Sequence, residues 1–232
     1  MLKKVVDLYN KIRMMGDYQV LFCEWLRVKL PLLTRSQTVV IKKQSLMKEF
    51  LSRIHKVENE IIEEYLSFWK EYSVAKNTIV TWEGSTERYM YFVLSGIQKS
   101  YYPKGNKEHI IAFTYPPSFS GIPESFLTQT PSRYFLKTIT ESKFLRISFK
   151  KQQELMLKHR SIETLFRKAT ELLLIDTLNR YYELMAFDIE TRFRNFTKRS
   201  PHLLQMVSQK DLASYLRIDQ TNFSKLMGKV KI

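Results

Sequence analysis

The chain has 232 residues, of which 44% are hydrophobic and 26% are charged, a composition typical of a folded globular protein. Its 38 lysines and arginines outnumber the 23 acidic residues, and the formal net charge of +15 favours an anionic partner such as nucleic acid or a membrane surface. No apolar run approaches the roughly 18 residues that a transmembrane helix requires, so we expect no membrane-spanning segment.

Cysteine and histidine usage excludes several cofactors. The single cysteine, Cys23, excludes an intramolecular disulfide and an iron–sulfur cluster. The four histidines are far apart and lack the spacing of metal ligands, so no metal site is expected. This usage fits a reducing compartment, and we expect a cytoplasmic protein.

Residues 1–46 differ from the rest of the chain. They carry nine basic residues against three acidic ones, with weak apolar clusters around Trp25. A signal peptide is disfavoured because neither a sufficient apolar region nor a small-residue cleavage site is present. A regular helical pattern begins at Met47, so we interpret residues 1–46 as an N-terminal extension of uncertain origin, either appended or a misassigned leader. Mapping that showed translation to start at Met1 would remove this hypothesis.

Residues 47–158 are predicted to form a helix followed by a β-roll. Apolar residues between Phe50 and Trp69 recur every three or four positions, which indicates one amphipathic helix or two short ones. Short runs of β-branched and aromatic residues then alternate with turn formers, and we expect strands at 79–82, 89–94, 97–102, 109–114 and within 134–147. Many short strands at close spacing favour an antiparallel barrel or roll, such as the cupin-like, double-stranded β-helix, and the fold class is therefore α+β.

A long helix is predicted at 159–186. Its apolar residues recur at three or four positions: Leu165, Ala169, Leu172, Ile175, Leu178, Tyr182 and Met185. This seam is compatible with packing on the roll. A helix this long beside a small barrel is explained at least as well by pairing with its own copy.

The final segment, 187–232, contains the strongest local signal, a helix-turn-helix between residues 207 and 230. Ser208 and Asp211 form a start that resembles a capping box, and Asp219 is a suitable N-cap for the next helix. In that second helix Phe223, Leu226 and Val230 are expected to point inward. The opposite face offers hydrogen-bonding and basic side chains suited to base edges and phosphates, and we predict DNA contacts at Gln220, Thr221, Asn222, Ser224, Lys225 and Lys229.

The order of helix, roll, long helix and helix-turn-helix resembles the Crp/Fnr family of transcription regulators, over about residues 47–232. The resemblance is carried by segments 91–96 (YFVLSG) and 121–133, and by Leu212, Ala213, Leu216, Phe223, Ser224 and Lys225. Segments 91–102 and 126–134 look most like the branch found in Bacteroidetes-type bacteria. The resemblance implies a cyclic-nucleotide-binding-like sensor domain, a homodimer joined along 159–186, and a palindromic promoter site on double-stranded DNA.

Two residues depart from the family pattern. Arg217 stands in the turn where the family often has glycine, which affects the expected turn geometry. Lys225 stands where arginine is usual, and lysine lacks the planar fork that binds guanine with two hydrogen bonds. We therefore expect a different preferred DNA sequence.

The resemblance also indicates an effector site in the roll, at Gly121, Glu124, Ser132 and Arg133. Family members that bind cyclic AMP place glycine and glutamate side by side, whereas here Glu124 is displaced by two positions and Pro123 removes a backbone N–H. A cyclic nucleotide is therefore disfavoured. Another small-molecule effector, or none, remains open.

The sequence thus predicts a homodimeric DNA-binding transcription regulator, with RNA polymerase as an optional further partner. We expect a signal in the roll to shift the two long helices and thereby the spacing of the DNA-reading helices. The alternative is a small-molecule sensor whose C-terminal helices bind a protein. No nucleophile, base and acid set or phosphate-binding loop is present, so an enzyme is not expected.

Overall fold

The computed structural model describes residues 35–229, with side chains from residue 43 onward. The first described element is α3 (Arg35–Ile54), followed by α4 (Asn59–Ser67), so the predicted apolar segment forms two helices. The boundary that we placed after residue 46 falls inside α3, which continues without a break across it. The rest of the N-terminal extension and Val230 lie outside the described residues.

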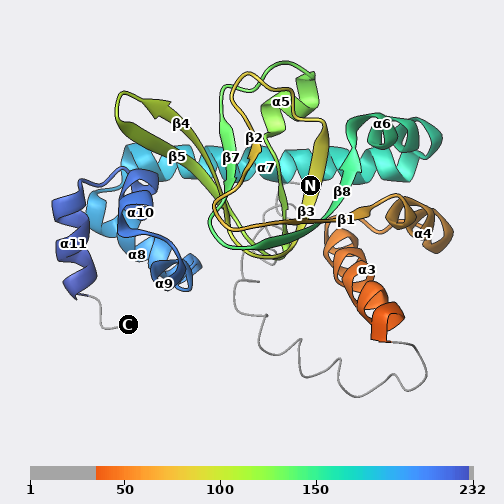
Figure 1. Ribbon diagram of the computed structural model, residues 1–232, viewed down its shortest axis with the longest axis horizontal. Coiled ribbons are helices and arrows are strands. Elements are labelled where there is room, and N and C mark those ends of the chain that lie inside the picture. The colour runs from red at the N-terminus through yellow and green to blue at the C-terminus, as the bar shows by residue number, and fades with distance from the viewer. Residues whose placement is uncertain (1–34, 230–232) are drawn as a thin grey trace.

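The centre of the molecule is a roll of two four-stranded antiparallel sheets, as predicted (Figure 1). The first sheet has the order β1-β8-β3-β6 and the second the order β2-β7-β4-β5. The strands are β1 (Lys70–Val74), β2 (Ile79–Thr81), β3 (Tyr89–Ser95), β4 (Gln98–Lys104), β5 (Lys107–Thr114), β6 (Ser118–Ser120), β7 (Phe135–Thr138) and β8 (Ser142–Ser148). A short helix, α5 (Pro123–Thr128), lies between β6 and β7.

Two strands, β1 and β6, were not predicted from the sequence. Strand β1 has the sequence KEYSV and is largely exposed, so it lacks the apolar alternation of a half-buried strand. Strand β6 has only three residues. Both lie at the edges of the first sheet, where fewer side chains need to be buried. The turn between β3 and β4 requires Gly96, because a Cβ there would lie 2.4 Å from the backbone oxygen of Glu141.

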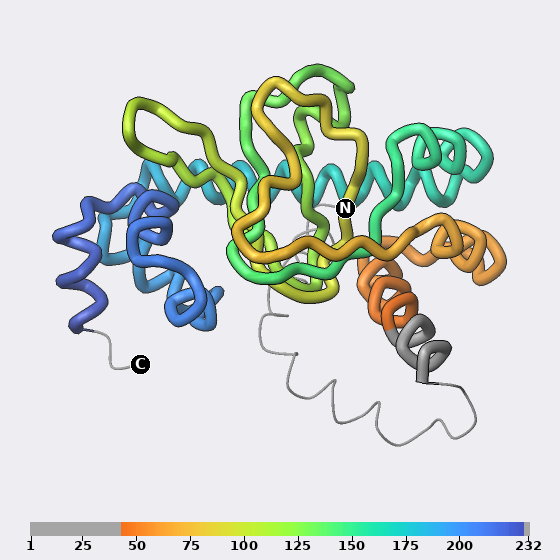
Figure 2. The backbone as a smooth tube through the Cα atoms, in the orientation of Figure 1, coloured from red at the N-terminus to blue at the C-terminus, as the bar shows by residue number. Residues whose placement is uncertain are grey.

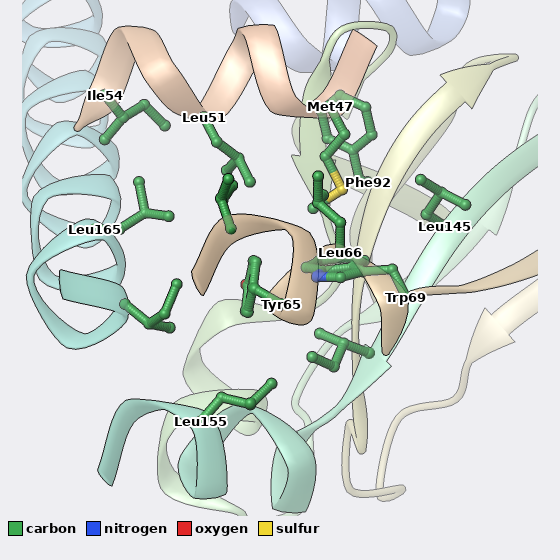
Figure 3. Close-up of a cluster of buried hydrophobic side chains, with 13 residues drawn as sticks. Met47, Leu51, Ile54, Tyr65, Leu66, Trp69, Phe92, Leu145, Leu155 and Leu165 are labelled. Atoms are coloured by element: carbon green, nitrogen blue, oxygen red, sulfur yellow. The ribbon is translucent and has the colours of Figure 1, made fainter. Parts of the chain in front are cut away.

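The two faces of the first sheet pack into different cores. Alternate residues of β8 separate the two, with Phe144 pointing into the roll and Leu145 pointing outward. The outer core fills the space between this sheet and the helices α3, α4, α6 (Phe149–Lys158) and α7 (Arg160–Ala186), as Figure 3 shows. Its members include Met47, Leu51, Tyr65, Trp69, Phe92 and Leu165.

Helix α7 extends along the molecule from the outer core to the C-terminal helices (Figure 1). The predicted seam is divided between two environments. Leu165 is buried in the outer core, and Ala169 and Leu172 pack against that core, so the first half of the seam serves this chain's own fold. In the second half Ile175 is half-buried, whereas Leu178, Tyr182 and Met185 are between 57% and 71% accessible. Leu174 and Tyr181, which the predicted seam did not include, are also exposed.

The C-terminal part is helical: α8 (Ile189–Arg199), α9 (Leu203–Met206), α10 (Gln209–Leu216) and α11 (Gln220–Lys229). These helices enclose a third core that contains Phe193, Phe196, Leu212, Leu216 and Phe223. Among residues 35–229, no helix combines the length and apolar character needed to cross a bilayer.

Candidate nucleic-acid interface and effector site

Helix α10 begins with the predicted cap. The hydroxyl of Ser208 accepts a hydrogen bond from the backbone N–H of Asp211 at 3.1 Å, which satisfies one of the free donors of the first turn. Leu212, Ala213 and Leu216 are buried against the neighbouring helices. The small Ala213 is 1% exposed, so the helices approach closely at this point.

The turn between α10 and α11 is closed by Arg217 in the left-handed conformation, with φ 54° and ψ 44°. Arg217 therefore adopts the backbone conformation that glycine takes without strain. Its N–H and that of Ile218 donate to the carbonyls of Ser214 and Ala213 at 3.2 and 3.0 Å, which completes the helix end. Ile218 is buried beneath the turn.

Asp219 is the N-terminal cap of α11, as predicted. One carboxylate oxygen accepts from the backbone N–H groups of Thr221 at 2.8 Å and Asn222 at 3.3 Å. The hydrogen bonds from Asn222 and Thr221 hold the pKa of Asp219 below its usual value. Two donors at the start of α11 are thus satisfied within the protein.

Helix α11 presents one apolar and one polar face. Phe223 and Leu226 are buried in the third core. All six residues that we assigned to DNA contacts are exposed: Gln220, Thr221, Asn222, Ser224, Lys225 and Lys229. The helix lies at one end of the molecule, outside α10 (Figure 1). This arrangement allows its polar face to reach a partner without rearrangement of the core.

Three arginines join these helices to α7, and no sequence pattern indicated these contacts. Arg180 donates to the backbone oxygen of Tyr215 at 2.6 Å. Arg192 donates to the carbonyls of Leu184 at 3.0 Å and Arg217 at 3.2 Å. Arg199 pairs with the Glu183 carboxylate at 3.0 Å. A basic residue alone gives no signal for such contacts, because their partners are set by helix packing.

The four residues predicted for an effector site are only partly brought together. Arg133 pairs with Glu124 at 2.8 Å on the surface, where the arginine side chain is 72% accessible. The buried hydroxyl of Ser132 forms its hydrogen bonds within its own loop. It donates to the carbonyl of Tyr134 and accepts from the backbone N–H of Tyr134. Gly121 precedes α5, with φ 133°, and lies against Tyr89 and Tyr91 of β3.

A buried carboxylate near this loop was not anticipated. Glu87 is 2% exposed and accepts from the hydroxyl of Thr81 and from the N–H of Tyr89 at 3.2 Å. Burial raises the pKa of Glu87, and hydrogen bonds from Thr81, Tyr89 and Ile122 partly offset that effect. Ile122 is the residue before α5, so this carboxylate anchors the start of that helix.

Comparison with known proteins identifies chains with a similar fold. Residues 71–159 match the family described as cyclic nucleotide-binding domain. Among solved structures, FixK2 from Bradyrhizobium japonicum is 16% identical, with a TM-score of 0.59 over 69% of this chain and 83% of that chain. The c-di-GMP responsive global regulator CLP from Xanthomonas campestris is 19% identical, with a TM-score of 0.54 over 74% of this chain and 91% of that one.

A CooA variant from Carboxydothermus hydrogenoformans is 16% identical, with a TM-score of 0.55 over 75% of this chain and 84% of that chain. A search of curated protein sequences gave no match. At these identities the likeness shows the fold alone, which this chain shares with FixK2, CLP and CooA.

The residues of this roll do not fit a cyclic nucleotide. A cyclic phosphate needs an available cation and free N–H donors. Arg133 is already paired with Glu124, and Pro123 has no N–H to offer. Within the described residues, no group of three or more histidine, cysteine or acidic side chains is placed to hold a metal ion.

Proposed function

We propose that this chain, which has the fold of the Crp/Fnr regulators, is a DNA-binding transcription regulator that acts as a homodimer in the cytoplasm. The observation that carries the proposal is the exposed polar face of α11 on a capped and well-packed helix pair. Glutamine, threonine and asparagine side chains on such a face both donate and accept hydrogen bonds to base edges. The formal net charge of +15 supports attraction to a polyanion.

The exposed half of α7 supports the homodimer. Leu174, Leu178, Tyr181 and Met185 follow one another at spacings of four, three and four residues, which is the repeat of a helix that pairs with another helix. Their exposure leaves a continuous apolar strip on one side of the helix. A second copy of α7, related to the first by a two-fold axis, would cover this strip. Each copy of α11 would then face one half of a palindromic site.

Lys225 and Lys229 have different proposed roles. Lys225 lies on the exposed face in the middle of α11, beside the residues that we assign to base edges. Lys229 lies in the last turn and is suited to a phosphate. The relatives that share this fold are regulators rather than enzymes, and we propose no catalytic reaction for this chain.

The proposal is tested by selecting binding sites from a random DNA pool with the full-length protein. We expect a palindromic consensus and gel-shift affinity that falls steeply as salt rises. Lys225→Ala should weaken binding to the selected site by about tenfold or more, which corresponds to about 1.4 kcal/mol.

Lys104→Ala is the matched control, since Lys104 is an exposed lysine on the β4–β5 hairpin and should leave affinity nearly unchanged. Selection without a consensus, or equal effects of the two variants, would contradict a DNA-reading role for α11. In that case a protein partner for the C-terminal helices becomes the better explanation.

A further inference from the structure

The C-terminal helices contact the roll along one side of the β4–β5 hairpin. Figure 2 shows this hairpin extending from the roll to the C-terminal helices. Strand β5 is the edge of its sheet, and the hydroxyl of Ser214 on α10 bonds to its free backbone groups. That hydroxyl donates to the carbonyl of Glu108 at 2.8 Å and accepts from the N–H of Ile110 at 3.1 Å. Helix α10 thus completes the hydrogen bonding of an edge strand.

Lys99 lies at the centre of this contact. Its side chain is 9% accessible, and its ammonium group is 3.0 Å from both carboxylate oxygens of Asp211 on α10 and 2.5 Å from the carboxylate of Glu108 on β5. One lysine of the roll therefore joins its own hairpin to the first turn of the helix-turn-helix. An ammonium group so deeply buried is stable only with such partners.

Apolar contacts surround the lysine. Ile97, two residues before it, is 2% exposed and belongs to the same core as Leu212 and Phe223. Phe113 of β5 and Tyr215 of α10 have ring centroids 5.0 Å apart. A second attachment lies elsewhere, where the hydroxyls of Tyr115 and Ser200 are 2.6 Å apart. These contacts would keep the helices attached without the lysine.

The apolar and ionic contacts have different consequences for geometry. Apolar burial is non-directional, so it holds two surfaces together without fixing their relative orientation. An ammonium group between two carboxylates, by contrast, has a defined position. Helix α10 is rigidly joined to α11, because the turn at Arg217 closes on the carbonyls of α10 and Asp219 caps α11. The orientation of α10 on the hairpin therefore determines the orientation of α11.

We propose that Lys99 is a positioning residue: by clamping Asp211 and Glu108 it fixes the angle at which the DNA-reading helix leaves the roll. This inference rests on the proposed function. In a dimer, the two clamps would set the distance and direction between the two copies of α11, and thus the spacing between half-sites that the protein accepts. Loss of the clamp would relax that spacing while each helix could still read its half-site.

The clamp is tested first without DNA, by hydrogen exchange on the full-length protein. Lys99→Met keeps the length and apolar stem of the side chain and removes its charge. We expect the amide of Ile110, which donates to Ser214, to exchange at least tenfold faster in Lys99→Met than in the natural protein. Lys104→Met, on the exposed part of the same strand, should leave that rate within twofold.

A charge exchange separates clamping from general stability. Lys99→Glu alone gathers three carboxylates, and adding Asp211→Lys restores one ammonium group between two carboxylates. The double variant should recover slow exchange at Ile110, and the single variant should not. If Lys99→Met fails to fold, Asp211→Asn provides the same comparison from the other partner.

The second measurement is the preference of the protein for the spacing between the two half-sites. Affinities are compared for the selected palindrome, for the same site with one base pair inserted at its centre, and for a single half-site. We expect Lys99→Met to reduce the preference for the selected spacing at least fivefold, with half-site affinity within twofold of the natural protein. Unchanged exchange and unchanged spacing preference in a folded Lys99→Met variant would overturn the inference. Absence of sequence-specific binding by the natural protein would instead refute the proposed function, and the exchange experiment would still judge the clamp.

Discussion

The guanidinium carbon of Arg180 lies 3.5 Å from the centroid of the Tyr215 ring, and the same group donates to the backbone oxygen of Tyr215 at 2.6 Å. Arg180 belongs to α7 and Tyr215 to α10, so one side chain joins the long helix to the first helix of the helix-turn-helix. Burial lowers the pKa of Arg180, yet an arginine remains charged in a folded protein. The ring face and the carbonyl oxygen therefore compensate a charge removed from water.

Arg180→Lys should be destabilising although the charge is kept. Lysine cannot lay a planar group on the ring and donate to the carbonyl at the same time, so we expect the free energy of unfolding to fall by about 1–3 kcal/mol. Urea denaturation measures this change. Arg167→Lys is the control, since Arg167 is half exposed on the same helix and pairs with Glu171 one turn away. If both variants lose the same free energy of unfolding, the contact between Arg180 and Tyr215 does not contribute to stability beyond an exposed ion pair.

Arg217→Gly should stabilise the protein. Arg217 holds a left-handed conformation, φ 54°, that costs a residue with a Cβ on the order of 1 kcal/mol. Part of the gain is lost because glycine is more flexible in the unfolded chain, so we expect a net increase of about 0.5–1 kcal/mol in the free energy of unfolding. Arg217→Ala removes the same long side chain but keeps the Cβ. If alanine and glycine raise the melting temperature equally, backbone strain is not the cause.

Local chemistry made much of this structure predictable. The caps at Ser208 and Asp219 act within three residues of their partners, and the strands around Phe92 and Phe144 carry the β-branched and aromatic residues that favour sheets. Exposure of the α11 polar face followed from the spacing of Phe223 and Leu226. These features depend on neighbours that the sequence itself places close together.

The remaining features depend on partners far away in the chain. Lys99 and Asp211 are 112 residues apart, and no residue near either one indicates that the two charges will compensate each other. The same holds for the α7 seam, in which Leu165 is buried by distant parts of this chain and Leu178 is exposed. The buried Glu87 was missed for a related reason, because its donors come from three separate segments.

Leu178→Lys should break the proposed dimer. Leu178 is 57% exposed in the single chain and lies in the middle of the apolar strip of α7. Placing a charge there removes about 1.5–3 kcal/mol of apolar burial from each of two copies, which weakens association at least a hundredfold. Sedimentation equilibrium measures the change. Leu157→Lys is the matched control, because Leu157 is 89% exposed on α6 and lies off the strip. A dimer that survives Leu178→Lys would exclude this face of α7 as the contact.

Glu87→Gln should change how stability depends on pH. Burial raises the pKa of Glu87 above its usual value of 4.5, so between pH 4.5 and the folded-state pKa the folded protein binds more protons than the unfolded chain. The contribution of Glu87 to the free energy of unfolding therefore falls as pH rises through this window and is constant above it. Each unit by which burial raises the pKa corresponds to about 1.4 kcal/mol.

Glutamine keeps the acceptor for Tyr89 and Tyr91 and does not titrate, and its amide can donate to the hydroxyl of Thr81. The stability of Glu87→Gln relative to the natural protein should therefore increase from pH 4 to neutral pH and then level off, as measured by urea denaturation at each pH. Glu83→Gln, at an exposed position nearby, is the control for the loss of a carboxylate from this region. A difference that stays constant with pH would mean that the fold leaves the protonation of Glu87 unchanged, because its hydrogen bonds then offset the burial penalty in full.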